Sequence, residues 1–278
     1  MPKEEFAERE FPMTSRDFEE IRGLAYKITG IALTDHKKNM VYGRISRRLR
    51  LLKIASFHEY CLEIQRDGSP ELNNFVNAIT TNLTSFFREN HHFEHLKSTV
   101  IPNLLRSNAS SKRIRVWSAG CSTGEEAYSI AMVLHQFSAL RDWDVKILAT
   151  DLDSNVVNTG RGAVYHQDRV EKIPSAYNKY FERAHDSEQV RVRDDISSKV
   201  TFKQLNLLHK WPMKGEFDVI FCRNVVIYFD VSTQKVLFDR YAGIMSADAH
   251  LFIGHSENLH KITDRFESRG RTIYQKVC

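Results

Sequence analysis

The chain has 278 residues, of which 42% are hydrophobic and 27% are charged, and it contains only 12 glycines and 6 prolines. This composition excludes collagen-like, low-complexity and fully disordered proteins, because enough apolar side chain is present to form a core. The 40 basic and 35 acidic residues leave a formal net charge of +5, which permits an acidic partner but is small for a dedicated nucleic-acid-binding protein.

The first 13 residues are charged and lack the apolar core of a signal peptide. We expect them to fray, as undocked chain ends usually do. No apolar run of about 18 residues is present to span a bilayer. The four cysteines, at positions 61, 121, 222 and 278, form no CxxC pair. These features predict a cytoplasmic protein with reduced thiols and no insertion into a membrane.

No metal site is expected from the sequence. Cys/His spacings typical of zinc sites are absent. His91 and His92 are adjacent in the chain, so on a helix their side chains would point about 100° apart. We therefore interpret them as surface or packing residues.

Residues 14–84 are predicted to form a small all-helical domain. Apolar residues recur at helical spacing, and no hairpin signal interrupts them. Thr14 or Ser15, followed by Asp17, is typical of the start of a helix. Helix stops are predicted at Gly30 and at the Gly-Ser-Pro triplet of residues 68–70.

Residues 85–111 are predicted to be a linker and connecting helix, and residues 112–278 a second domain. There the pattern changes to short, continuously apolar runs that alternate with helical segments, which is typical of a parallel sheet covered on both faces. The predicted strands are residues 114–117, 145–149, 200–205, 217–221, 251–254 and 272–277.

The segment of residues 164–196 interrupts this alternation. It is rich in charged residues and tyrosine, and its stretch QVRVRDD alternates at period two. We interpret residues 189–193 as part of an antiparallel excursion from the main sheet.

A ligand loop is predicted within residues 113–134, RIRVWSAGCSTGEEAYSIAMVL. A strand runs into a loop of small residues and then into a helix, which lets a ligand approach the backbone at the first strand-to-helix turn. The loop is neither GxGxxG nor a P-loop. Glu125 and Glu126 argue against a pyrophosphate and for a ligand with positive charge, although each acid alternatively complements the helix dipole.

Polar residues also follow the next predicted strands. Asp151 ends the second strand, where an acid can accept both hydroxyl groups of an adenosine ribose. Asp153 is interpreted as a helix cap. Residues 204–207, Gln-Leu-Asn-Leu, offer an amide and apolar walls for an adenine ring. Arg223 and Asn224 end the fourth core strand, where Asn224 is alternatively a simple turn residue.

From about residue 14 to its end, the chain resembles the CheR family of chemotaxis receptor methyltransferases. The resemblance depends on the motifs ITTNLTSFFREN, VWSAGCSTGEEAYS, ATDLD, NLL, FDVIFCRNVVIYF and GHSEN, which occur in the order of the family. It departs at Ala127, where the family has proline. The resemblance implies an α/β fold: a doubly wound, Rossmann-like class I methyltransferase sheet with a small N-terminal all-helical domain and an inserted antiparallel β subdomain.

The resemblance also implies an activity and a site. Members of the family use S-adenosylmethionine to methylate glutamates on the cytoplasmic helices of chemoreceptors, which leaves S-adenosylhomocysteine. Arg88 is suited to the carboxylate of the cofactor, and the acids to its ammonium group and ribose. The cofactor-binding residues implied by the matching positions are Asn82, Thr84, Arg88, Glu125, Asp151, Asn206, Leu207, Arg223 and Asn224.

Methyl transfer to a glutamate needs no general base, because a carboxyl group with an ordinary pKa near 4.3 is already ionised at pH 7. Catalysis then depends on alignment, exclusion of water and management of charge. Hydrogen-bond donors suit this task better than a strong cation, since charge is neutralised during the reaction. Tyr228 is our first candidate to orient the acceptor carboxylate and Arg223 our second; Tyr228 is alternatively a core aromatic.

A basic segment lies between Asp35 and Glu59, where the sequence contains seven basic residues and no acid. We predict that this helix attracts acidic receptor helices, although a run of charge is alternatively only a solvated face. On that helix the buried stripe is predicted to be Val41, Ile45, Leu49 and Leu52. The partner-binding residues are predicted to be Lys37, Arg44, Arg47, Arg48 and Arg50.

Some members of the family bind a pentapeptide at the receptor C-terminus through the inserted subdomain. The excursion of residues 164–196 occupies that place, but its short turn RAHDSEQ lacks the expected glycines. Two other functions compete with receptor methylation. A nucleic-acid methyltransferase is disfavoured because RNVVIYF lacks the Pro-Pro-aromatic motif and the basic patch lacks stacking aromatics. A non-catalytic module that senses the cofactor is disfavoured by the intact set Glu125, Asp151, Arg223 and Asn224.

Overall fold

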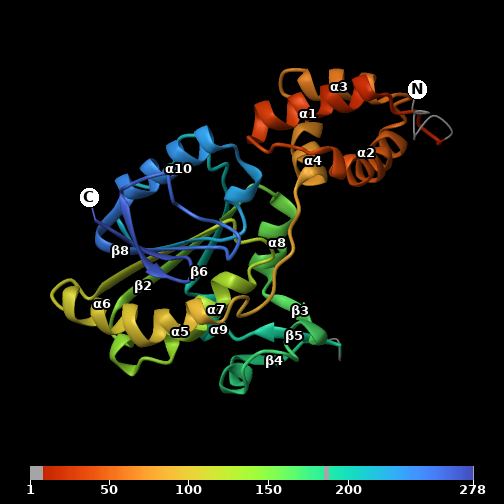
Figure 1. Ribbon diagram of the computed structural model, residues 1–278. Coiled ribbons are helices and arrows are strands. Elements are labelled where there is room, and N and C mark those ends of the chain that lie inside the picture. Colours follow the sequence, from red (N-terminus) through yellow and green to blue (C-terminus); the bar gives the residue numbers. More distant parts are fainter. Residues whose placement is uncertain (1–8, 185–187, 278) are drawn as a thin grey trace. The chain divides into compact units, whose positions relative to one another are not determined.

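The computed structural model describes residues 9–184 and 188–277 (Figure 1). The chain divides into two compact units, one of residues up to Thr81 with Tyr228–Asp230, and one of Asn82–Ile227 with Val231 to the C-terminus. Most of the N-terminal segment that the sequence predicts to fray, residues 1–8, lies outside the described residues, as does Cys278. The three described cysteines are free thiols, and all three are buried.

The N-terminal unit is built of helices, as the sequence predicts. Thr14 caps the first helix, because its hydroxyl accepts a hydrogen bond from the Asp17 N–H at 3.2 Å while the Asp17 carboxylate accepts from the Thr14 N–H at 2.8 Å. Gly30 ends that helix with a φ of 75°. The helices are α1 (Ser15–Thr29), a 3-10 helix (Asp35–Lys37), α2 (Lys38–Leu52), α3 (Phe57–Gln65) and α4 (Glu71–Ile79).

Helix α2 buries the apolar stripe expected for it, with one exception. Val41, Ile45 and Leu49 are fully buried. Leu52 is 39% exposed, so its predicted place in the stripe is wrong. It is the last residue of α2, and the left-handed Lys53 that follows ends the helix before another turn can cover it.

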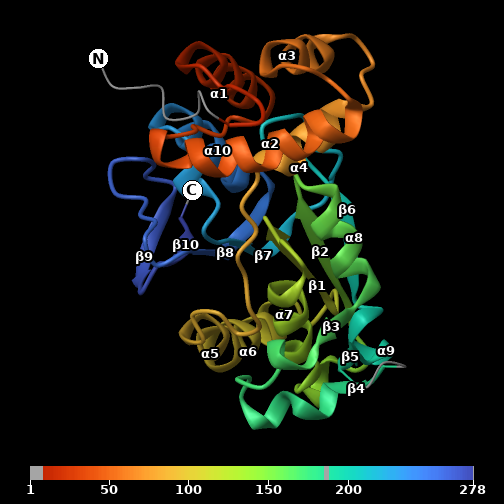
Figure 2. The same cartoon turned by 90° about the vertical axis from the view of Figure 1, so that its right-hand side faces the viewer.

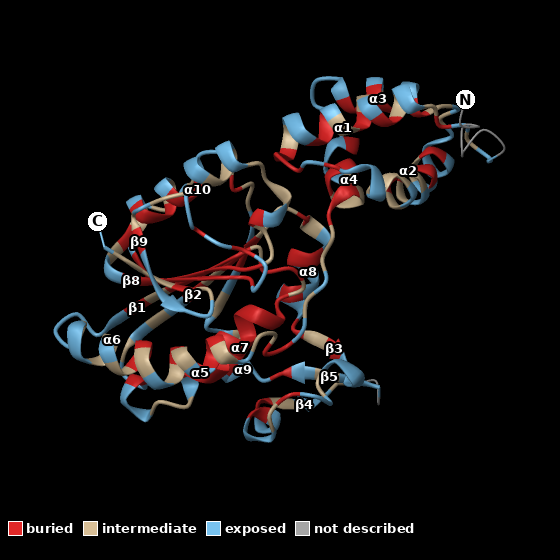
Figure 3. Ribbon diagram, viewed as in Figure 1, coloured by how far each residue is buried: buried red, intermediate tan, exposed pale blue. Residues whose placement is uncertain are grey.

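The second unit contains a seven-stranded sheet in the order β6-β2-β1-β7-β8-β10-β9. The pairs from β6 to β8 are parallel, as the continuously apolar runs predict, and every residue of β7 is buried. Figure 3 shows buried strands at the centre of the sheet and exposed residues on the outer side of the helix α10. The strands are β1 (Arg113–Ala119), β2 (Asp144–Asp151), β6 (Val200–Gln204), β7 (Phe217–Cys222), β8 (Met245–Ile253), β9 (Phe266–Gly270) and β10 (Ile273–Lys276).

The C-terminal edge of this sheet departs from the parallel arrangement that the alternation of strands and helices predicts. Strand β10 is antiparallel to both β8 and β9. It follows β9 through a tight turn in which Arg271 and Thr272 have positive φ, so a hairpin replaces a helical crossover. Strand β9 was not predicted, because only Phe266 of its five residues is buried.

Helices cover both faces of the main sheet: α5, α6 and α7 lie on one face and α10 on the other (Figure 1). None of the helices in the described part of the chain is both long and apolar enough to cross a membrane. The helices of this unit are α5 (His91–His95), a π-helical turn (Leu96–Val100), α6 (Ile101–Ser107), α7 (Glu125–His135), α8 (Ser154–Gly162), α9 (Asp194–Ser197) and α10 (Val231–Ile244).

The predicted antiparallel excursion is a separate three-stranded sheet (Figure 2). Strand β5 (Gln189–Val192) is central and pairs with β3 (Val164–His166) and β4 (Phe181–Arg183), both antiparallel. The prediction for residues 189–193 is confirmed as far as Val192. Residues 185–187 of the turn RAHDSEQ lie outside the described residues.

Candidate functional site

The loop between β1 and α7 is held against the end of β2. The N–H groups of Gly120 and Cys121 donate to the carbonyl oxygen of Thr150 at 2.8 and 2.9 Å. Gly120 has a φ of 100°, and a Cβ there would lie 2.3 Å from Cγ2 of Val225. This position therefore requires glycine, both for its backbone conformation and for the close approach of the segment that follows β7.

Asp151 lies at the carboxyl end of β2, as the sequence predicts. Its two oxygens accept hydrogen bonds from the N–H groups of Ser122, at 2.8 Å, and Asp153, at 3.0 Å. Burial raises the pKa of Asp151 to about 6, against the opposing effect of these amides. The carboxylate is thus fixed in orientation beside the small-residue loop.

Asn82 is brought to the same loop. Its side-chain amide donates to Asp153 Oδ2 at 2.7 Å, and its backbone carbonyl accepts from the Ser122 hydroxyl at 2.9 Å. Asp153 is buried and caps α8 through the Asn155 N–H, which confirms its interpretation as a helix cap. Asn82 and Asp151 are therefore linked through the loop.

The Glu125 carboxylate is fully buried and has two partners. It accepts a hydrogen bond from the Thr123 hydroxyl at 2.6 Å and forms an ion pair with Arg169. Arg169 also donates to the carbonyl of Thr84 at 3.1 Å. Arg169 therefore joins Thr84 to Glu125. The sequence gives no signal for this arginine, because in a charge-rich segment nothing distinguishes it from solvated neighbours.

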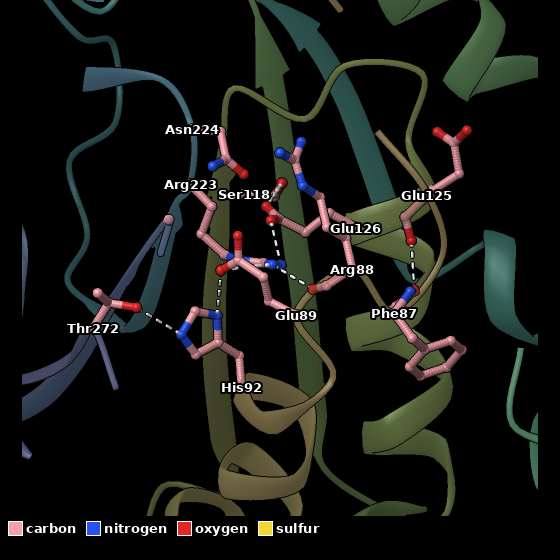
Figure 4. Close-up of polar contacts among 12 residues, drawn as sticks. Phe87, Arg88, Glu89, His92, Ser118, Glu125, Glu126, Arg223, Asn224 and Thr272 are labelled. Carbon is pink, nitrogen blue, oxygen red and sulfur yellow. Dashed lines mark hydrogen bonds and ion pairs between the residues drawn. The ribbon is translucent and has the colours of Figure 1, made fainter. Parts of the chain in front are cut away.

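Glu126 belongs to a second, buried cluster of charge (Figure 4). Its carboxylate accepts hydrogen bonds from Ser118 Oγ at 2.7 Å and from Arg223 Nη1 at 3.1 Å. Arg223 also lies 3.3 Å from Glu89 Oε2 and donates to the carbonyl of Arg88. Glu126 thus does more than complement the helix dipole, because it neutralises a buried arginine.

The charges of this cluster shift its titrations in opposite directions. Burial by itself raises the pKa of Glu89, but Arg223 and the hydrogen bonds from His255 hold it at about 2. Burial raises the pKa of Glu126, with Arg223 opposing. The Arg223 side chain is only 2% exposed and is placed between two acids. It is therefore poorly suited to orient an acceptor carboxylate, which argues against our second candidate for that role.

The segment before α5 has an unusual backbone that places Arg88. Phe87 and Glu89 have φ of 52° and 56°, a left-handed conformation that non-glycine residues adopt at a cost. The Phe87 N–H donates to Ser129 Oγ at 3.0 Å, and the Arg88 side chain donates to the Leu83 carbonyl at 2.8 Å. Arg88 is half-buried beside the predicted Asn82–Thr84 segment, so both belong to the same end of the unit.

His91 and His92 are closer than the sequence analysis predicts. Their ring centroids are 4.2 Å apart, and with Glu89 they could place ligand atoms within 4.8 Å of one another. The expectation that the rings diverge is wrong, because both point to the Arg271 carbonyl oxygen, which lies 3.3 Å from Nε2 of His91 and 3.0 Å from Nε2 of His92. His92 is fully buried, as the interpretation of a packing residue holds. The Arg223 guanidinium beside Glu89 opposes a cation at this place, and we continue to expect no metal.

The remaining predicted cofactor residues lie at the carboxyl ends of β6 and β7. The Asn206 side chain accepts from the Leu208 N–H at 2.9 Å, and Leu207 is buried. Asn224 has a φ of 57°, so it does occupy a turn, as the alternative interpretation holds. Tyr228 ends a 3-10 helix (Val226–Tyr228) and is grouped with the N-terminal unit, where its carbonyl accepts from the Ala32 N–H at 3.0 Å.

The predicted basic face of α2 is partly occupied by the fold of its own unit. Arg48 forms a two-fold hydrogen-bonded pair with the buried Glu71, with both N···O distances 2.7 Å. Arg44 donates to the carbonyls of Ala78, at 3.1 Å, and Thr80. Arg50 pairs with Glu10. The expectation that these charges are uncompensated is wrong, because acids distant in the sequence pair with Arg48 and Arg50, and backbone carbonyls accept from Arg44.

Two of the predicted partner residues remain available on this face. Arg47 is exposed, and no ion pair is found for it within residues 9–184 and 188–277. Lys37 is half-buried at the start of the helix. These two positions, rather than Arg44 or Arg48, can meet an acidic partner without breaking contacts of the fold.

Comparisons with known proteins cover nearly the whole chain. Residues 82–275 match the family described as CheR methyltransferase, SAM binding domain, and residues 16–80 match CheR methyltransferase, all-alpha domain. Chemotaxis protein methyltransferase 2 of Pseudomonas aeruginosa is 42% identical over 278 residues, covering 98% of this chain and 97% of its own. Chemotaxis protein methyltransferase of Escherichia coli is 40% identical, covering 94% of this chain and 91% of its own.

Proposed function

Because the chain belongs to the CheR methyltransferase family, we propose that it methylates glutamate side chains on the cytoplasmic helices of chemoreceptors. The products are glutamate methyl esters and S-adenosylhomocysteine. S-adenosylmethionine is the cofactor, and the reaction serves chemotaxis. The proposal adds to the family membership the acceptor group, its location on receptor helices and the residues that carry out the reaction.

The observation that carries the proposal is the set of acids and amides at the carboxyl ends of β1 and β2. Asp151 presents a fixed carboxylate, and Asn82 is bonded to the same loop. Glu125 adds a buried acid at the start of α7, where a phosphate would otherwise be favoured. This set fits a ligand with hydroxyl groups and positive charge, as in adenosylmethionine, and does not fit a dinucleotide.

In this proposal Asp151 binds the ribose, Glu125 the methionine portion, and Asn206 and Leu207 the adenine. Asn82, Thr84 and Arg88 complete the methionine side, and Asn224 lines the pocket together with Arg223. When bound, the cofactor supplies an electrophilic methyl group on its sulfonium.

The chain's own residues then have to align the acceptor and exclude water, since an ionised glutamate needs no base. Tyr228 is our candidate to orient the acceptor carboxylate through its hydroxyl. Arg223 is excluded from that role by its own pairs with Glu89 and Glu126. A Tyr228→Phe variant is expected to lose turnover with little change in the affinity for S-adenosylhomocysteine, and full turnover would remove Tyr228 from the mechanism.

We also propose that the exposed positions of α2 bind the acidic receptor helices, with Arg47 and Lys37 as the contacts. Positive charge on an exposed helix steers acidic partners at low ionic strength. The small sheet is a second possible contact, for an extended peptide at a receptor C-terminus. Its strands β3 and β4 are both edge strands, to which such a peptide can add. Calorimetry with a receptor tail peptide tests that contact directly.

Transfer of a labelled methyl group to receptor membranes tests the function as a whole. We expect label on the receptor that alkali releases, because methyl esters hydrolyse in base. Base-stable label on nucleic acid would support a nucleic-acid methyltransferase instead. Binding of the cofactor without any transfer would support a non-catalytic module.

A further inference from the structure

The GHSEN motif contains a buried acid that the site described above does not use. Glu257 is 4% exposed and follows β8. Its Oε1 accepts the N–H groups of Val225, Val226 and Ile227 at 2.8, 2.9 and 3.3 Å. Its Oε2 accepts the N–H of Asn224 at 2.9 Å and also that of Gly254. The Glu257 side chain thus accepts hydrogen bonds from the backbone N–H groups of four successive residues, 224–227.

The turn of residues 224–227 follows the end of β7 and lies against the loop between β1 and α7, which belongs to the proposed cofactor site. Val225 is so close to Gly120 that a Cβ there would meet Val225 Cγ2 at 2.3 Å. On the other side, a Cβ on Gly254 would lie 2.4 Å from Nδ2 of Asn224 and 2.7 Å from its backbone nitrogen. The turn is therefore enclosed between the β1–α7 loop and the β8 end.

The arrangement requires a carboxylate. Successive N–H groups that point to one side need acceptors, and both oxygens of Glu257 are used. A glutamine of the same shape offers one oxygen, and its NH₂ group would face backbone donors. Unsatisfied buried N–H groups are costly, so the turn would shift to find other acceptors.

We infer that Glu257 is a positioning residue for the cofactor pocket, which it shapes by fixing the turn of residues 224–227 and, with it, Asn224 and the contact of Val225 with Gly120. The inference rests on the proposed cofactor site. It assigns to this glutamate an effect on affinity for the cofactor and its product, although Glu257 itself does not touch them.

Calorimetric titration of the full chain with S-adenosylhomocysteine tests the inference. In Glu257→Gln the Kd is expected to rise about tenfold, and the KM for S-adenosylmethionine with it. The matched control is Asp218→Asn. Asp218 is also buried, and its carboxylate accepts a hydrogen bond from the Arg115 N–H at 2.7 Å. It lies at the start of β7, whereas the turn of residues 224–227 follows the end of that strand. This control is expected to lower the melting temperature and leave the Kd unchanged.

A Kd unchanged in Glu257→Gln would overturn the inference. A Kd raised equally in Asp218→Asn would also overturn it, in favour of a general effect on folding. If Glu257→Gln does not fold, Gly254→Ala displaces the same turn and is expected to raise the Kd, and an unchanged Kd would again overturn it. Asp151→Asn distinguishes a failure of the proposed cofactor site from a failure of the positioning role of Glu257. If it leaves the Kd unchanged, the proposed cofactor site is wrong. If only Asp151→Asn weakens binding, the positioning role alone is wrong.

Discussion

Arg48 in the N-terminal unit and Arg223 in the second unit each pair with a buried acid, and in both cases the pairing removes a positive charge that the sequence suggests for function. In the N-terminal unit, Arg48 lies on the helix whose positive charge suggests a partner, yet it pairs with the buried Glu71. In the second unit, Arg223 belongs to a cofactor motif, yet it pairs with Glu126 and Glu89. Each arginine serves first to neutralise an acid inside its own unit.

An arginine that is paired with a buried acid of its own unit is therefore not available to an acidic ligand or partner. Burial raises the pKa of Glu71, but Arg48, together with Tyr60 and Asn74, holds it below its usual value. The exposed Arg47, one position earlier, has no such commitment among the described residues. Fewer basic residues of α2 are therefore available to an acidic partner than the sequence suggests.

The largest expected effect is at Asp151, whose hydrogen bonds among the described residues come from backbone N–H groups rather than from a cation. Asp151→Ala is expected to lower methyl transfer at subsaturating cofactor by about 100-fold, because it removes the carboxylate proposed to hold the ribose. The control is Asp144→Asn, at the opposite end of the same strand, whose side chain is half-exposed. Equal losses in the two variants would mean that the effect comes from the sheet and not from the site.

The second prediction concerns stability. Arg48→Ala is expected to cost about 2 kcal/mol of unfolding free energy, because it leaves the buried Glu71 without its cation. Chemical denaturation measures this cost. A double variant, Arg48→Met with Glu71→Gln, should recover part of it, since the unpaired charge is then removed. Unchanged stability combined with weaker receptor methylation would instead make Arg48 a docking residue.

The third prediction uses pH to sharpen the description of the second unit. Burial lowers the pKa of His92 to about 3, with the charge of Arg223 acting in the same direction. The unfolded chain therefore binds a proton at His92 as the pH falls below about 6.5, whereas the folded chain does not. The contribution of His92 to the free energy of unfolding is therefore fully present above about pH 6.5. It decreases steadily as the pH falls from there toward 3.

At pH 5.5 this histidine should account for about 1 kcal/mol of lost stability. Denaturation of His92→Gln should show a shallower pH dependence between 7 and 5.5 than the unmodified chain. His250, whose pKa burial lowers to about 4, contributes the same kind of slope and remains in both proteins. Parallel pH profiles would show that His92 is accessible to protons in the fold.

The smallest expected effect is at the partner surface. Arg47→Glu is expected to lower the initial rate of receptor methylation about threefold at low salt, with the difference disappearing as salt screens the charges. The melting temperature should not change. Lys235→Glu, an exposed lysine on α10, is the control. A loss of rate that persists at high salt, or that Lys235→Glu reproduces, would remove α2 from the proposed interface.

Local patterns predicted much of this fold because local contacts determine it. Thr14 and Gly30 bound α1 through backbone capping, and the apolar run of β7 is buried as expected. The position of Asp151 was predictable for the same reason, since this residue ends an apolar strand of the sheet. The partners of Glu125 and Arg48 were not predictable, because Arg169 and Glu71 reach them across many residues of chain. The hairpin of β9 and β10 was not predictable, because four of the five residues of β9 are exposed and the strand therefore has no apolar pattern.

The most direct test of the account is a crystal structure of the chain with S-adenosylhomocysteine bound. We predict that the ribose hydroxyl groups lie within hydrogen-bonding distance of the Asp151 carboxylate, with the amino-acid end toward Glu125. Product bound away from the carboxyl ends of β1 and β2, or a pocket that never accepts it, would contradict the assignment of the site.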